Sequence, residues 1–98
     1  MQFIIFARAR ACVERAVERN PRSYRAHRLR AAIAIDLGDF ETAERSFALC
    51  EELEPEVTPE GLRTAEFKRR RFPAEFAAFL LDRDPVRFHW AKRYLLKH

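Results

Sequence analysis

The sequence contains 98 residues, of which 48% are hydrophobic and 35% are charged, and its formal net charge is +4. This length suffices for one compact domain but not for two, and the apolar content excludes an intrinsically disordered protein. Only two glycines occur, and Ala, Arg, Glu and Leu dominate, so we expect a single helical domain over residues 1–98.

The first predicted helix covers residues 2–19. Phe6, Ala9 and Val13 recur on one face at the helical period. The apolar segment that begins this helix is short and runs directly into Arg8, so it is neither a signal peptide nor a membrane span. We therefore expect a cytoplasmic protein. The same segment is a candidate for self-association into a homodimer through Phe3, Ile4, Ile5 and Phe6.

Two further amphipathic helices are predicted over residues 22–37 and 40–53, separated by Gly38 and Asp39. Glycine readily adopts the positive φ that ends a helix, and an aspartate side chain can cap the next helix. The expected apolar stripe of the first of these helices consists of Ala26, Leu29, Ile33 and Leu37. The stripe of the second consists of Phe40, Ala43, Phe47, Cys50 and Leu53.

Three more helices are predicted in the C-terminal part. Thr58 and Pro59 supply a cap and a first-turn proline for a helix from residue 59 to about residue 70. A second helix begins at Pro73 and ends before Pro85. The last is expected to be continuous, with Val86, Trp90 and Tyr94 on one apolar stripe and Phe88, Ala91 and Leu95 on the next. No strand is predicted, so the fold class is all-α.

No motif in the sequence predicts catalysis, a metal or a cofactor. The three histidines are scattered, and we find no HExxH pattern, Cys/His cluster, phosphate-binding glycine loop or Ser/His/Asp combination. His27 is interpreted as a packing residue between helices. Cys12 and Cys50 are both expected to be buried and reduced, with a Cys12–Cys50 disulfide as the alternative.

The most specific pattern is a repeat centred on residues 26–55. Its positions are Ala31 and Ala34 in the first helix, Gly38, Asp39 and Phe40 in the turn, and Ala43, Phe47, Cys50, Leu53 and Pro55 in and after the second helix. Part of this pattern recurs 34 residues earlier, and 34 residues is the length of a tetratricopeptide repeat. The earlier copies of Ala43, Phe47, Cys50 and Pro55 are Ala9, Val13, Ala16 and Pro21. The stretch from His27 to Pro55 resembles one such repeat, although His27 stands where the family prefers Trp and Arg30 where it prefers Leu.

The resemblance implies a short right-handed array of antiparallel helical hairpins with five or six helices. It divides the domain into a partial repeat over residues 1–21, a hairpin over 22–55 and a divergent basic and aromatic part over 56–98. A generic helical bundle, whose alanines match a loose motif by chance, is the alternative.

A tetratricopeptide-like hairpin also implies binding to another protein, as an adaptor, a chaperone-like subunit or a small protein inhibitor. The groove positions implied by the resemblance are Arg25, Arg28, Ala32, Ile35 and Asp36. Two guanidinium groups one turn apart favour an acidic peptide or the carboxyl terminus of a protein as ligand. The alternative interpretation is that these arginines are solvated surface residues.

Charge is segregated along the sequence. Residues 8–30 hold eight arginines and two glutamates (net +6), residues 36–56 hold eight acids and one arginine (net −7), and residues 60–98 hold ten basic and five acidic residues (net +5). Such blocks can pair within the domain or between two copies of it. The alternative function is nucleic-acid binding, with cations on phosphates and aromatic rings on bases. The patch for nucleic acid or an acidic partner consists of Lys68, Arg69, Arg70, Arg71, Arg87, Lys92 and Arg93.

Overall fold

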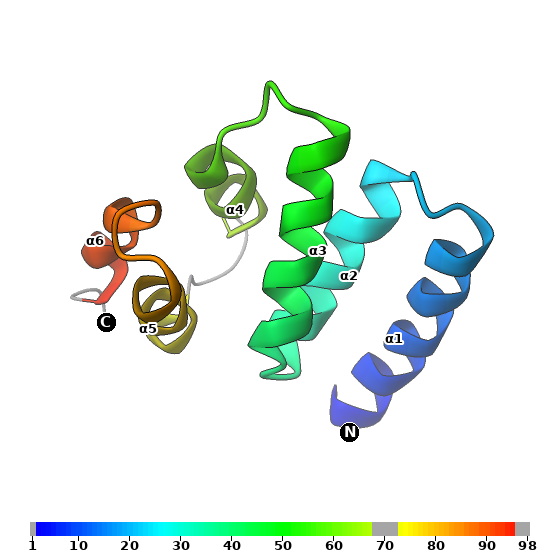
Figure 1. Cartoon of the computed structure of the whole chain (residues 1–98). Coiled ribbons are helices and arrows are strands. Elements are labelled where there is room, and N and C mark those ends of the chain that lie inside the picture. The colour runs from blue at the N-terminus through cyan, green and yellow to red at the C-terminus, as the bar shows by residue number, and fades with distance from the viewer. Residues whose placement is uncertain (1, 68–72, 96–98) are drawn as a thin grey trace. The chain divides into compact units, whose positions relative to one another are not determined.

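The computed structural model describes residues 2–67 and 73–95, and within these ranges the protein is helical and contains no strand (Figure 1). The elements are α1 (Gln2–Arg19), α2 (Tyr24–Asp36), α3 (Phe40–Leu53), α4 (Pro59–Phe67), α5 (Ala74–Arg83), the 3₁₀ helix η1 (His89–Ala91) and α6 (Lys92–Leu95). The predicted all-α class is confirmed. Over the same ranges, no helix is both long enough and apolar enough to cross a bilayer.

The protein divides into two compact units, residues 1–56 and 57–98. We call them unit 1 and unit 2. Their boundary lies one residue beyond the predicted limit between the hairpin and the divergent part of the sequence. That residues 1–98 fold as one domain stays a prediction.

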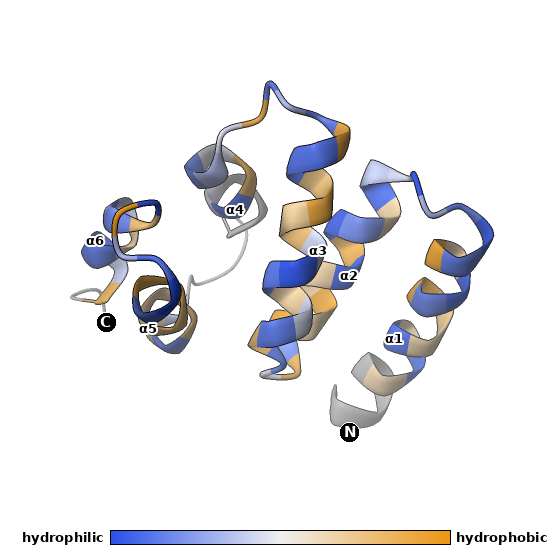
Figure 2. Ribbon diagram, in the orientation of Figure 1, coloured by the Kyte–Doolittle hydropathy of each residue, from blue (hydrophilic) through white to orange (hydrophobic). Residues whose placement is uncertain are grey.

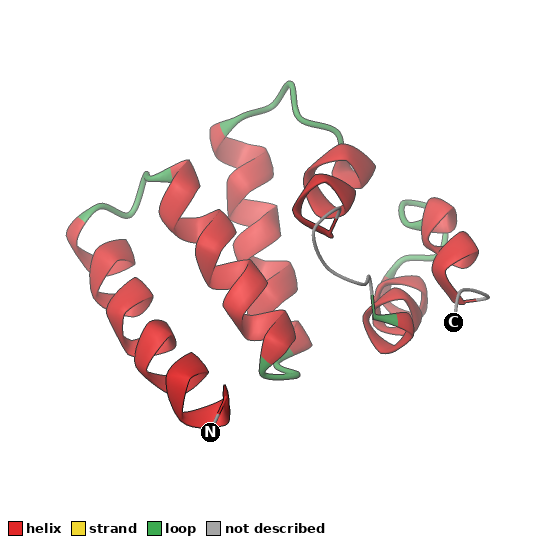
Figure 3. Ribbon diagram, turned by 180° about the vertical axis from the view of Figure 1, so that it is seen from behind, coloured by secondary structure: helices red, strands yellow, loops and turns green. Residues whose placement is uncertain are grey.

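Unit 1 consists of α1, α2 and α3, which follow one another as antiparallel neighbours, with α2 packed against both α1 and α3 (Figures 1 and 3). Each helix carries both apolar and polar residues, as packing on one side requires (Figure 2). The core contains Val13 from α1, Ala31 from α2, and Ala43 and Phe47 from α3. Ala31 and Ala43 are 0% exposed, and their small side chains allow the axes of α2 and α3 to approach closely.

The turn between α2 and α3 has the chemistry that the sequence predicts. Gly38 has a φ of 78°, its N–H donates to the carbonyl of Ile35 at 3.0 Å, and the N–H of Asp39 donates to the carbonyl of Ala34 at 2.8 Å. These two bonds close the C-terminus of α2 around a left-handed residue. The carboxylate of Asp39 then caps α3 by accepting the N–H of Thr42 at 3.2 Å.

Unit 2 comprises α4, α5, η1 and α6. Thr58 caps α4 as predicted, since its hydroxyl accepts the N–H of Gly61 at 2.9 Å. The predicted extension of this helix to residue 70 lies partly outside the described residues. Among the side chains of this unit that the structure describes, the buried apolar ones are Leu62, Phe76, Ala77, Leu80, Phe88, Trp90 and Ala91.

The prediction of a continuous last helix is wrong. A turn follows Pro85, then the short η1, in which the N–H of Ala91 donates to the carbonyl of Phe88 at 2.8 Å. Phe88 and Trp90 are both buried, with their ring centroids 6.1 Å apart. Residues two apart point to well-separated directions in a regular α-helix, so burying both rings in one core favours the tighter winding. Val86, which the continuous helix would place on the Trp90 stripe, is 83% exposed.

The two cysteines differ in environment. Cys50 is buried as predicted, but Cys12 is exposed, so the prediction of burial is wrong for Cys12. Both are free, and the alternative disulfide is not formed. Successive residues of an α-helix are rotated by about 100°, so a helix that buries Val13 on its packed side turns Cys12 away from it.

Candidate partner-binding site

The predicted groove residues on α2 fall into two groups. Arg25, Arg28 and Asp36 are exposed. Ala32 and Ile35 are only 1% and 6% exposed, so their side chains belong to the core and are removed from the predicted site. The face that α2 offers to a partner is therefore narrower than the sequence predicts.

Leu29 is the residue of this face that sequence reasoning missed. The helical period places it on the buried stripe of α2, but it is 51% exposed. Its position four residues after Arg25 was the available signal, because residues four apart share a helix face. A single exposed leucine is ordinary. Next to two exposed arginines, however, it adds an apolar contact to a cationic surface.

The arginines of this face lie near the end of α2 where positive charge is least favourable. The first turn of α2 contains no acidic residue, whereas Arg25 is exposed there and Arg28 follows about one turn later. A helix N-terminus carries a partial positive charge, so nearby cations cost stability, typically about 0.3–1 kcal/mol each. An anionic ligand would remove this repulsion, and the local potential favours such a ligand.

Arg28 lies over the ring of Tyr24, with its Cζ atom 5.9 Å from the ring centroid. Burial raises the pKa of the Tyr24 hydroxyl, and Cys50 raises it further, while Arg28 acts in the opposite direction. Tyr24 is consequently neutral at neutral pH. Its ring supports the guanidinium of Arg28 without cancelling the positive charge that a ligand would meet.

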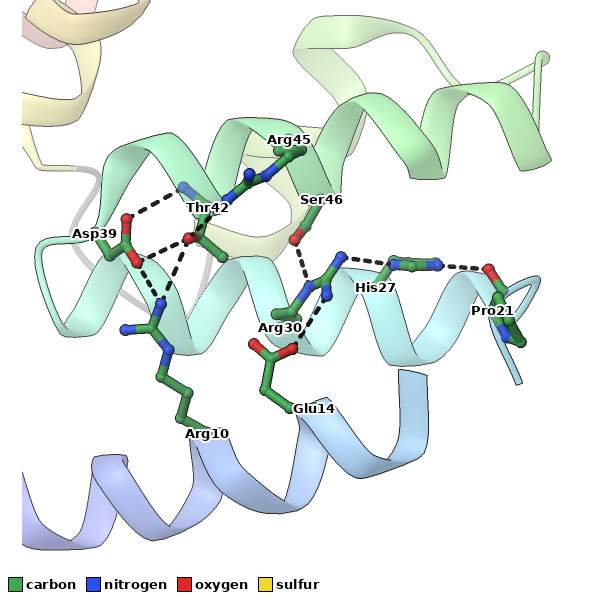
Figure 4. A network of polar contacts seen from close by, with 9 residues as sticks. All are labelled: Arg10, Glu14, Pro21, His27, Arg30, Asp39, Thr42, Arg45 and Ser46. Carbon is green, nitrogen blue, oxygen red and sulfur yellow. Dashed lines mark hydrogen bonds and ion pairs between the residues drawn. The ribbon is translucent and has the colours of Figure 1, made fainter. Parts of the chain in front are cut away.

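A polar network centred on Arg30 connects the three helices beneath this face (Figure 4). The Nε of Arg30 donates to the hydroxyl of Ser46 at 2.8 Å. One terminal nitrogen contacts the carboxylate of Glu14 at 3.2 Å, and the other contacts Nδ1 of His27, also at 3.2 Å. Since Glu14, Arg30 and Ser46 belong to α1, α2 and α3, a single side chain links all three helices.

His27 extends the network to the loop before α2. Its side chain is buried, as predicted for a packing residue, and its Nε2 lies 2.7 Å from the carbonyl oxygen of Pro21. A carbonyl oxygen only accepts, so Nε2 carries the hydrogen and donates it. Nδ1 is then the acceptor for Arg30, which assigns the neutral tautomer with hydrogen on Nε2.

A second polar cluster ties α1 to the turn between α2 and α3 (Figure 4). Arg10 forms an ion pair with Asp39 and donates to the hydroxyl of Thr42 at 3.4 Å. That hydroxyl donates to Asp39 at 2.8 Å and accepts from Arg45 at 3.2 Å. The basic and acidic blocks of the sequence therefore pair within unit 1 at this point.

The pKa of Asp39 is expected to give unit 1 a specific dependence on pH. The hydrogen bond from Arg10, followed by that from Thr42, holds this pKa below its usual range. The resulting stabilisation is complete above the ordinary aspartate pKa of about 4 and is lost as the pH falls through the lowered value. Asp39→Asn keeps a capping residue but removes the charge. We expect it to cost about 1 kcal/mol at pH 7.

Urea unfolding followed by circular dichroism checks this expectation. The difference between the wild type and Asp39→Asn should shrink as the pH is lowered below about 4. A difference that stays constant down to the lowest pH at which the protein is folded would contradict it.

The predicted basic patch of the C-terminal part is only partly described. Lys68, Arg69, Arg70 and Arg71 lie outside the described residues. Arg87 and Lys92 are exposed, and Arg93 contacts Glu60 at 2.9 Å. Phe88 and Trp90 are 2% and 7% exposed, so neither ring is available to stack on a base. The nucleic-acid alternative thereby loses two of its three aromatic residues, and the third, Tyr94, is half-buried.

Two other features bear on function. The side chains of Phe3, Ile4, Ile5 and Phe6, the predicted self-association segment, lie outside the described part of the structure. Among the residues that are described, no three His, Cys, Asp or Glu side chains converge on a point where they could hold a metal ion.

Comparison with known proteins gives no relative: no family model, no curated protein and no solved structure matches the sequence. The resemblance to a tetratricopeptide repeat therefore stays a prediction. Its support comes from the residues of this protein, chiefly the α2–α3 hairpin with its glycine turn and the close approach at Ala31 and Ala43.

Proposed function

We propose that unit 1 is a tetratricopeptide-like module that binds an acidic segment of another protein on the exposed face of α2. The observation that carries this proposal is the pair of exposed arginines, Arg25 and Arg28, beside the exposed Leu29. Carboxylates of the ligand would accept hydrogen bonds from the two guanidinium groups. An apolar side chain of the ligand would pack against Leu29.

Two further features support this proposal. The arginines lie at the positive end of α2, where an anion relieves an unfavourable interaction. The Arg30 network holds α2 in place from the opposite side, so a ligand would meet a preorganised surface and lose less entropy on binding. In this role the protein acts in the cytoplasm by occupying a surface of its partner, as an adaptor, a chaperone-like subunit or a small inhibitor.

Fluorescence polarisation with a labelled peptide tests the proposal. The probe is a short peptide of alternating Glu and Leu with a free C-terminal carboxylate, and the comparison peptide has Lys in place of each Glu. We expect binding of the first peptide only. Arg28→Glu should weaken it about tenfold, and Arg25→Glu with Arg28→Glu should abolish it. Arg8→Glu, which makes the same charge change at an exposed position of α1, is the control and should leave binding unchanged.

Two results would count against the proposal. The first is an Arg28→Glu protein that binds the acidic peptide as tightly as the wild type does. The second is preferential binding to short RNA or DNA, with affinity that falls steeply as salt is raised. That result would favour the nucleic-acid alternative, because phosphate contacts release counterions.

A further inference from the structure

Three helix ends meet at one end of unit 1. Because its helices alternate in direction, α1 ends, α2 begins and α3 ends on the same side, as both views show (Figures 1 and 3). The thiol of Cys50, in the last turns of α3, lies 3.7 Å from the carbonyl oxygen of Tyr24, the first residue of α2. The end of α3 is thus directly beside the start of α2.

Opposite charges occupy the two halves of this end. The basic half holds Arg19 and Arg22, from the end of α1 and the loop before α2, and the acidic half holds Glu52, Glu54 and Glu56, from the end of α3 and just beyond. All five residues are exposed, and so is Glu18 in the last turn of α1, which lowers the net positive charge of the basic half. We call this surface, defined by these five residues, the dipolar end. The two ion pairs described above, Arg10–Asp39 and Glu14–Arg30, involve none of them.

The backbone of α2 and α3 strengthens the charge separation at the dipolar end, whereas the C-terminus of α1 carries a partial negative charge that Arg19 compensates. The start of α2 carries a partial positive charge and has no acid in its first turn. The end of α3 carries a partial negative charge and has no basic residue in its last turn. Arg22 and the glutamates therefore add to the helix dipoles instead of compensating them. In α2 and α3, helix stability alone favours the reverse arrangement, and this supports a role for the charges at these two helix ends in binding a charged surface.

A surface with a positive half beside a negative half is complementary to itself after a twofold rotation. We propose that the dipolar end is the surface through which two copies of this protein associate, with the basic half of each copy facing the acidic half of the other. Such a twofold interface makes every contact twice. Both halves of the complementary partner are present in this protein, whereas any other protein would have to supply the same two halves in the opposite order.

This association is separate from the proposed function. The dipolar end uses Arg19 and Arg22, whereas the proposed peptide site uses Arg25 and Arg28 on the face of α2. The variant with Glu52→Arg and Glu56→Arg changes only the end of α3, so it should leave binding of the acidic peptide intact, and the two proposals fail independently.

Reversal of charge tests the twofold association in the protein of 98 residues. One variant carries Arg19→Glu and Arg22→Glu, a second carries Glu52→Arg and Glu56→Arg, and a third carries all four changes. Sedimentation equilibrium would measure the molecular mass of each protein, and of an equimolar mixture of the first two, over a range of concentration. Circular dichroism confirms that each is helical, which is expected because all four positions are exposed.

The charge pattern determines the expected results. The wild type should dimerise at low salt, with a dissociation constant that rises at least about tenfold in 1 M salt, where the Debye length is about 3 Å. Each of the first two variants should be monomeric alone, because like charges then face each other. Their mixture should form a heterodimer, and the variant with all four changes should dimerise again.

Three results would overturn the proposal. A wild-type protein that is monomeric at low salt would do so, and so would a dimer that persists in both of the first two variants. The third is a mixture of folded variants that does not associate, since restoration by the opposite charge is the specific property of a paired surface.

Discussion

Arg30→Leu is expected to lower the free energy of unfolding of unit 1 by about 3 kcal/mol, although leucine is the residue that tetratricopeptide repeats prefer at this position. Arg30 donates to Glu14, His27 and Ser46. Loss of Arg30 leaves two buried polar side chains without their hydrogen bond to the guanidinium group, since His27 is 2% and Ser46 is 0% exposed. Leucine supplies apolar volume but no hydrogen bond. Urea unfolding followed by far-UV circular dichroism would measure the change.

A double-mutant cycle isolates the hydrogen bond between Arg30 and Ser46. Ser46→Ala removes the buried hydroxyl, so the double variant with Arg30→Leu should be less destabilised than the sum of the single variants, by about 1–2 kcal/mol. Arg45→Leu is a control, because Arg45 is exposed and bonds only to Thr42 among the contacts described. An Arg30→Leu protein that is as stable as the wild type, or more stable, would show that the polar network contributes no net stability to unit 1. Apolar packing of the leucine that the tetratricopeptide pattern prefers would then stabilise the three helices equally well.

Phe47→Ala is expected to cost about 4 kcal/mol. Phe47 is 0% exposed and lies on the same side of α3 as Ala43 and Cys50, which are also 0% exposed. Removal of the ring gives up the free energy gained by its transfer from water into the core. It also leaves a cavity that helices already in close contact cannot fully close. The change should therefore be visible as a lower midpoint in urea and in thermal unfolding, with binding of a partner lost only in proportion to the fraction unfolded.

Leu29→Ala provides the matched comparison for Phe47→Ala. It also deletes apolar atoms, but from a side chain that is 51% exposed, so it should change stability by no more than about 0.5 kcal/mol. The effect of Leu29→Ala on the affinity for the acidic peptide should be larger than its effect on stability, because Leu29 is the apolar contact of the proposed peptide site. A Phe47→Ala cost below about 1 kcal/mol would mean that the interface between α2 and α3 is loosely packed.

The sequence predicted best those features that depend on neighbouring residues. Gly38 and Asp39 specify the turn between α2 and α3 through local backbone and capping chemistry, and Thr58 does the same at the start of α4. Features that depend on tertiary contact were predicted less well. The helical period alone placed Leu29 and Cys12 on buried stripes, but the side on which a neighbouring helix packs decides exposure. Which side of each helix is packed becomes visible only in the folded arrangement of α1, α2 and α3.

The polar network was the least accessible to sequence reasoning. Glu14 and Ser46 each lie 16 residues from Arg30 in the sequence, so no local pattern connects them. Arg30 itself stands out in the sequence only as a departure from the tetratricopeptide pattern. A large polar residue in the middle of an otherwise small and apolar helix face was the available signal, because such a residue is buried only where partners satisfy it.

The fluorescent side chains are divided between the two units. The sequence has one tryptophan and two tyrosines. Trp90, 7% exposed, lies in unit 2 with the ring of Tyr94 6.4 Å away, whereas Tyr24 belongs to unit 1. Tryptophan emission therefore reports the unfolding of unit 2, while far-UV circular dichroism reports the helices of both units. Identical midpoints from the two signals would show a single cooperative transition for the whole protein, and separate midpoints would show that each unit melts independently.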